Sequence, residues 1–192
     1  FLSLRQGDRV GLHFVERGGQ GLLGAVLGPR RVPIRGGSRH VEELVSRVAG
    51  EGAQGRGDLA AVASDAASRA RSADLVVVSD LLAERLDGVL DVLAVQRARG
   101  RSVQVVHVVD PAEISFPYEE PTRFEDLEGE EQLSANPREF ARAYREEFAA
   151  FLQECRVGCT RRGIRYLLLD TGSPLEDAIV PFLRGEGAPR GR

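Results

Sequence analysis

Asp80 is the side chain whose type and position point most directly to chemistry. It follows Leu75 to Val78 and Ser79, an apolar run that is typical of a parallel strand covered on both faces. Ligands of open α/β sheets bind at the carboxyl ends of the strands, where a carboxylate can hold a hard cation if other oxygen ligands converge on it. Asp80 is therefore a candidate ligand that needs partners.

The other chemical motifs in the sequence are weaker evidence for a functional site. The segment Gly19 to Gly24 matches a dinucleotide-binding fingerprint, but Gly28-Pro29 leaves no room for the helix that must follow, so a hairpin turn is favoured. His13 and His107 fall within predicted strands and are interpreted as core histidines. The chain has no GxSxG, P-loop, HExxH or paired CxxC motif. These observations favour a protein that is not an enzyme.

The first half of the chain has the pattern of alternating strands and helices that is typical of an α/β fold with a mostly parallel sheet. A glycine-rich stretch between the first two strands indicates a hairpin. The predicted strands cover 9–15, 31–34, 75–78 and 103–109, and the predicted helices cover 39–49, 58–71 and 84–99, with Ser38 and Asp58 as caps.

The second half contains an acidic insertion, 110–135, in which 124–127 and 132–135 are predicted to form a small hairpin. Asn136-Pro137 then begins a long helix. Its apolar side chains recur every three or four residues and should face the core: Phe140, Tyr144, Phe148, Phe151, Cys155 and Cys159. The strand 166–169 and a helix capped by the segment 173–176, which Pro181 should kink or end early, complete one predicted domain, 1–184, before a flexible tail, 185–192.

Composition limits the partners. A formal net charge of -3 and a pI near 5.7 argue against a nucleic-acid binder, and no apolar run is long enough to cross a bilayer. Two free thiols one helical turn apart favour a reducing compartment. We expect a cytoplasmic protein without membrane contact, and an upstream membrane anchor stays open. The sequence contains no Met, which predicts that upstream residues have been lost.

Charge is unevenly distributed. Residues 1–40 hold seven Arg against Asp8 and Glu16, whereas 119–131 hold seven acids against Arg123. Such runs are either solvated faces or docking surfaces.

Several segments resemble the bacterial family called domain of unknown function 58, which is related to the von Willebrand factor A fold. They are GDRVGLHF (7–14), VVVSDLL (76–82), VVDPAEISFPY (108–118), FEDLEGEEQL and NPREFARAYREEF. The resemblance extends to about Leu183. It implies a Rossmann-like, A-type three-layer sandwich whose mostly parallel sheet has one antiparallel edge strand and an inserted acidic hairpin.

The resemblance also implies a site for a divalent metal, with magnesium as the candidate ion. A domains hold this metal with three loops. Asp80 matches the third loop. The second falls just before Asp58, where Gly57 replaces the expected Thr. The first, a DxSxS loop, is absent. Asp80 and Asp58 are thus the metal-ligand predictions, and the site is incomplete.

In the A-type strand order, the first strand lies between the strands 9–15 and 75–78. The resemblance therefore predicts that this central strand is missing from the chain and that upstream residues supply it. Direct pairing of 9–15 with 75–78 would contradict this prediction.

Three functions remain in order of preference. The first is a non-enzymatic adaptor that works with a MoxR-type AAA+ ATPase, as the family implies, in protein assembly or maturation. Its candidate partner-binding residues are Asp110, Glu113, Glu128, Glu130 and Glu131. The second is a divalent-metal-dependent ligand-binding domain, and the third is a nucleotide-binding enzyme that uses Gly19 to Gly24.

Overall fold

The computed structural model describes residues 7–14, 31–50, 58–69, 72–82, 85–118, 120, 122–125, 132–135 and 137–184. The chain separates into two compact units, one formed by 1–70 and 126–131 and the other by 71–125 and 132–192. The prediction of one domain over 1–184 stays a prediction, and the tail 185–192 lies outside the described residues. No helix in the described ranges is both long and apolar enough to span a membrane.

The first unit is built on the predicted hairpin. Strands β1 (Val10–His13) and β2 (Arg31–Arg35) pair antiparallel, with an irregular register between Val10 and Leu12. Gly11 lies at this irregularity, where a Cβ atom would come within 2.9 Å of both Ile34 Cγ1 and the carbonyl oxygen of Val32. A glycine is therefore required for the two strands to approach this closely.

Helices α3 (Ser38–Gly50) and α4 (Leu59–Arg69) complete the described part of this unit. The buried His40 ring joins α3 to β1, because its Nε2 lies 2.7 Å from the carbonyl oxygen of Val10. Asp58 caps α4 as predicted, with Oδ1 accepting a 2.9 Å hydrogen bond from the Ala61 N–H. Ser38 is the first residue of α3, so this helix begins one residue earlier than predicted and Ser38 does not precede it.

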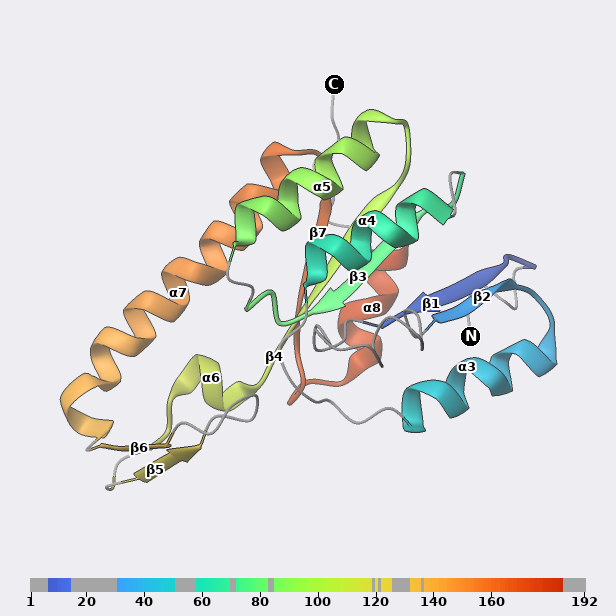
Figure 1. Cartoon of the computed structure of the whole chain (residues 1–192). Coiled ribbons are helices and arrows are strands. Elements are labelled where there is room, and N and C mark those ends of the chain that lie inside the picture. Colours follow the sequence, from blue (N-terminus) through green and yellow to red (C-terminus); the bar gives the residue numbers. More distant parts are fainter. Residues whose placement is uncertain are drawn as a thin grey trace, which may run out of the picture. The chain divides into compact units, whose positions relative to one another are not determined.

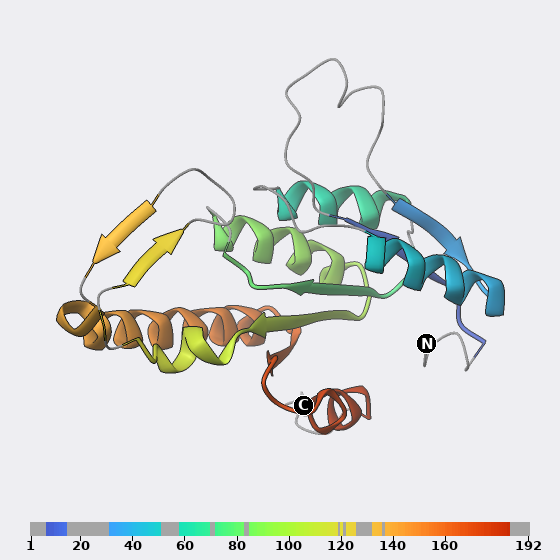
Figure 2. The same cartoon turned by 90° about the horizontal axis from the view of Figure 1, so that it is seen from below.

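The second unit contains a parallel sheet of three strands in the order β3-β4-β7 (Figure 1). The strands are β3 (Leu75–Ser79), β4 (Val103–Val109) and β7 (Arg165–Asp170). Helices α5 (Leu86–Ala98) and α8 (Leu175–Leu183) lie on opposite sides of this sheet (Figure 2). This arrangement confirms an α/β fold with a parallel sheet.

Helix α7 (Pro137–Arg161) begins at the predicted Pro and packs against β7 and α5. Its two thiols, Cys155 and Cys159, are fully buried, which confirms the end of the predicted core-facing stripe, whereas the four aromatic residues of the stripe are half-buried. The helix approaches α5 so closely at Gly158 that a Cβ atom there would lie 2.5 Å from Leu90 Cδ1. The close contact of α5 with α7 thus depends on glycine.

The acidic insertion forms the short helix α6 (Pro111–Ser115) and the antiparallel pair β5 (Thr122–Glu125) and β6 (Gln132–Ala135). The predicted hairpin is confirmed, with its first strand two residues earlier than expected. Helix α6 was not predicted. It begins at the Asp-Pro-Ala-Glu sequence that the resemblance had already singled out.

Two local predictions are wrong. Strand β3 is not covered on both faces, because Val76 and Val78 are 55% and 66% exposed and β4 is its only partner within the described strands. A continuous apolar run is equally compatible with an edge strand, so the sequence does not distinguish an edge strand from a strand that is covered on both faces. The last helix does not end early at Pro181, because it continues to Leu183; its N-cap, Pro174, lies within the predicted capping segment 173–176.

The arrangement of the described strands leaves the missing-strand prediction open. β1 pairs with β2 and β3 pairs with β4, so the pairing of β1 with β3 that would contradict the prediction does not occur. Whether another strand joins the sheet stays a prediction.

Candidate functional site

Three aspartates mark the carboxyl edge of the parallel sheet. Asp80 follows β3, Asp110 follows β4 and Asp170 ends β7. Each uses its Oδ1 to accept a hydrogen bond from a backbone N–H two residues on, at 3.1 Å from Leu82, 2.8 Å from Ala112 and 2.8 Å from Gly172, respectively. These carboxylates therefore shape the turns by which the chain leaves the sheet.

The side chains present do not fit the metal that the resemblance implies. A hard cation needs several oxygen ligands at once. Among the described residues, no group of three or more His, Cys, Asp or Glu side chains could hold a metal ion. Asp58 belongs to the other unit, where it caps α4. Asp80 and Asp58 as metal ligands stay predictions.

The two described partner-binding candidates, Asp110 and Glu113, form a capping box at the start of α6. The Asp110 side chain accepts from the Ala112 N–H, and the Asp110 N–H donates to Glu113 Oε2 at 2.8 Å. Both carboxylates thus hold α6 in place. Their role toward a partner stays a prediction. Glu128, Glu130, Glu131 and the Gly19 to Gly24 loop lie outside the described residues.

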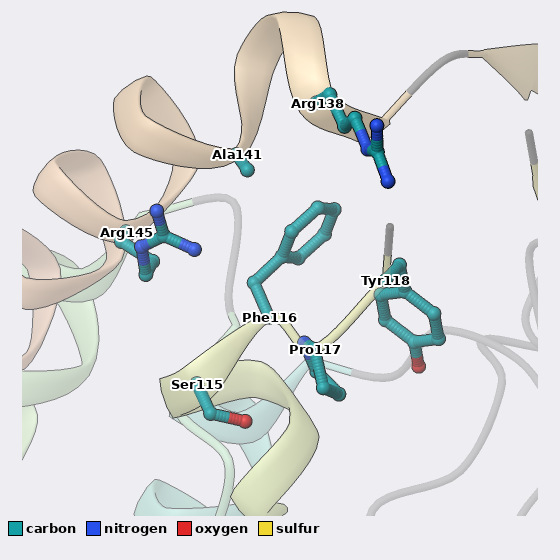
Figure 3. A pocket seen from close by; sticks show the side chains of 7 residues that line it. All are labelled: Ser115, Phe116, Pro117, Tyr118, Arg138, Ala141 and Arg145. Atoms are coloured by element: carbon teal, nitrogen blue, oxygen red, sulfur yellow. The ribbon is translucent and has the colours of Figure 1, made fainter. Parts of the chain in front are cut away.

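A pocket of about 470 Å³ lies where α6 meets α7 (Figure 3). Phe116, directly after α6, adopts φ 45°, a left-handed conformation that is uncommon outside glycine, and its side chain is buried. The view shows its ring pointing toward Ala141, between the side chains of Arg138 and Arg145. The lining consists of Ser115, Phe116, Pro117, Tyr118, Arg138, Ala141 and Arg145.

The spacing of the α7 residues explains the shape of the pocket. Arg138, Ala141 and Arg145 are three and then four residues apart, so they lie on one face of the helix. The small Ala141 side chain leaves the space that the Phe116 ring occupies. Phe116 is held there by Tyr144, whose ring centroid is 4.4 Å away. The pocket is therefore bounded by two guanidinium groups around an aromatic residue that is already fixed in place.

A row of aromatic rings runs from this pocket along α7 into the core. Tyr144 stacks on Phe148 with a centroid distance of 5.8 Å, and Phe148 lies 6.1 Å from Phe151. Phe151 meets the fully buried His107 ring edge-on at 5.7 Å. The ring of Phe116 in the pocket thus joins one end of an aromatic row whose other end packs against the sheet.

The titratable groups at the buried end of this row are held in their neutral forms. His107 Nδ1 lies 2.8 Å from the Tyr166 hydroxyl, and burial lowers the pKa of His107, an effect that Asp80 opposes. Burial raises the pKa of Cys155 to about 12 and that of Cys159 to about 11. Thiols held in this way are poor nucleophiles, so they contribute packing rather than catalysis.

The arginine-lined pocket was not predicted from the sequence. One signal was present: the capping box of Asp110 and Glu113 places a short helix before Phe116, and an Arg-x-x-Ala-x-x-x-Arg spacing on the next long helix gives one basic face. Tertiary contact between the two helices could not be inferred from either pattern alone.

Comparison with known proteins identifies a family and nothing narrower. No curated protein and no solved structure matches the chain. The model of one family, described as "Protein of unknown function DUF58", matches residues 1–157, which is most of the chain and includes β3, β4, α6 and most of α7. The match covers the segments whose sequence resembled this family, and the chain therefore belongs to the DUF58 family.

Proposed function

We propose that this chain is a non-enzymatic protein-interaction module that works with a MoxR-type AAA+ ATPase in the assembly or maturation of other proteins. The observation that carries the proposal is the apolar surface of β3. Val76 and Val78 are more than half exposed on a strand with one described partner, and Leu82 just beyond it is 63% exposed. Exposed apolar side chains on an open strand edge are typical of sites where another strand binds.

The chemistry at the sheet edge supports binding over catalysis. Asp80, Asp110 and Asp170 are engaged in local turns, and the buried His107 and thiols are held neutral. An active site needs a base or nucleophile within reach of a substrate.

The proposal extends to the fold. In an A-type sandwich, a central strand supplied by upstream residues would pair with the free backbone edge of β3, whereas Val76 and Val78 project from a face of that strand and stay available to a partner. An unpaired edge is an aggregation hazard that proteins normally cover. Hydrogen exchange can test this point, because the amides of β3 would exchange more slowly once a strand pairs with that edge than they do in the 192-residue chain.

The interaction itself is tested with the purified MoxR-type ATPase of the same organism. Binding is measured by biolayer interferometry for the chain and for a variant with Glu128→Arg, Glu130→Arg and Glu131→Arg. We expect the reversal to weaken binding at least about tenfold, because it places like charges against a surface that is complementary to the acidic segment.

The matched control is the triple charge reversal Glu42→Arg, Glu147→Arg and Glu154→Arg on exposed positions of α3 and α7. It should leave binding unchanged. Equal weakening of binding by both variants would show that net charge alone causes the effect and that the acidic segment is not the binding surface. Absence of ATPase binding by the unaltered chain would reject the adaptor function.

A further inference from the structure

We propose that the pocket between α6 and α7 binds a carboxylate of an acidic peptide segment in a partner protein. The inference rests on the proposed interaction function and names the site and the chemistry of the bound group. The pocket has the size of a site for one or two side chains, and its two guanidinium groups flank Phe116 (Figure 3).

The charge of the pocket calls for an anion. Two arginines and no acid are among its lining residues. Arg138 already makes an interaction within the chain, so the inference rests on the charge of Arg145. Arg145 makes no hydrogen bond or ion pair with any residue in the described part of the chain. Its neighbour one turn earlier on the helix, Arg142, does pair with Glu146 at 2.7 Å. An arginine fork with free donors at a pocket wall is suited to bidentate contact with a carboxylate.

One acid close to the pocket, Glu113, is already engaged. Glu113 lies close enough to raise the pKa of Tyr144, together with burial, which is the main cause. Its Oε2, however, accepts from the Asp110 N–H in the capping box. The carboxylate that Arg145 would bind is therefore expected from outside the pocket.

The pocket is arranged before any ligand binds. Phe116 is fixed by contacts with three aromatic rings. The distances between ring centroids are 4.4 Å to Tyr144, 5.2 Å to Tyr118 and 5.5 Å to Phe140. Arg138 and Arg145 start from one long helix, so their separation is set by two helical turns. Less ordering is then needed on binding, which favours affinity.

The surroundings favour a peptide over a nucleic acid. Pro117 and Tyr118, which is 38% exposed, give the pocket an apolar and aromatic side that can contact the aliphatic part of an acidic side chain or its apolar neighbour. A nucleic acid would need a long basic surface, whereas this chain carries a net charge of -3.

The test uses fluorescence anisotropy with a short labelled peptide of alternating Glu and Leu, amidated at its carboxyl end. The peptide should bind the full chain, and Arg145→Gln should weaken binding at least about tenfold. Arg161→Gln, which removes an exposed arginine from the last turn of the same helix, is the matched control and should leave the affinity unchanged.

Further arms separate the sources of the anion. A Gln/Leu peptide of the same length should not bind, and inorganic phosphate should compete only weakly. Equal affinity of Arg145→Gln and the unaltered chain would overturn the proposal, as would equal binding of the Gln/Leu peptide or tighter binding of a single-stranded oligonucleotide. The ATPase measurement, made on the same Arg145→Gln protein, reports separately on the interaction function, so a failed peptide site leaves that result intact.

Discussion

The two faces of the β3-β4-β7 sheet differ in the solvent exposure of their side chains. Helices α5 and α7 cover one face, and the opposite face is partly open. On the covered face, Val105 and His107 are fully buried beneath the helices. On the other face, α8 contacts β7, where the Arg165 guanidinium lies 4.5 Å from the centre of the Phe182 ring. At β3 that same face exposes Val76 and Val78.

This difference separates two tasks within one sheet. The covered face supplies most of the apolar burial, and hence the stability, of the second unit. The open face at β3 contributes little to the stability of the described chain and is available to another strand. The three predictions below test that division, beginning with the largest effect.

Leu93→Ala should lower the free energy of unfolding most, by about 3 kcal/mol, because it leaves a cavity under a helix that covers the sheet. Leu93 is fully buried on α5. Urea unfolding followed by circular dichroism measures the change. A loss below about 1 kcal/mol would mean that this face is not closely packed.

Acidification should destabilise the covered face through His107. Its pKa is lowered in the folded protein by burial, so the unfolded chain binds a proton first as the pH falls. The free energy of unfolding is therefore complete above the unfolded pKa of about 6.5 and declines as the pH falls from there toward the folded pKa.

Urea midpoints at about pH 7 and about pH 5 measure this decline. His107→Phe, which keeps an aromatic ring beside Phe151, should show a smaller decline than the unaltered chain. The remaining decline should include His13, whose pKa is also lowered by burial. An identical pH dependence in the variant would exclude His107 as a contributor.

Val78→Ala should have the smallest effect, below about 0.5 kcal/mol, because the side chain is already largely in water. The same truncation at Val105, one strand away on the covered face, is the matched control and should cost about 2 kcal/mol. Equal costs would show that β3 is covered in solution.

Elements whose structure depends on local sequence patterns could be predicted from the sequence. The stripe on α7 and the capping of α4 by Asp58 follow from spacing and local hydrogen bonding, and both are present. The apolar run of β3 could not show which strand edges are occupied, since pairing is a long-range property. Likewise, the contact between Phe116 and α7 joins segments more than twenty residues apart. The pocket could therefore not be predicted from the sequence, although the residues of the capping box before it are adjacent in the sequence.

The aromatic row along α7 also determines what an optical experiment can report. The chain contains no Trp and three Tyr, and Tyr118, Tyr144 and Tyr166 all belong to the second unit, at or beside this row. Intrinsic fluorescence excited in these rings therefore reports on the second unit, while the first contributes none of the signal. Far-ultraviolet dichroism records the helices of both units, so the difference between the two unfolding curves measures whether the units unfold together.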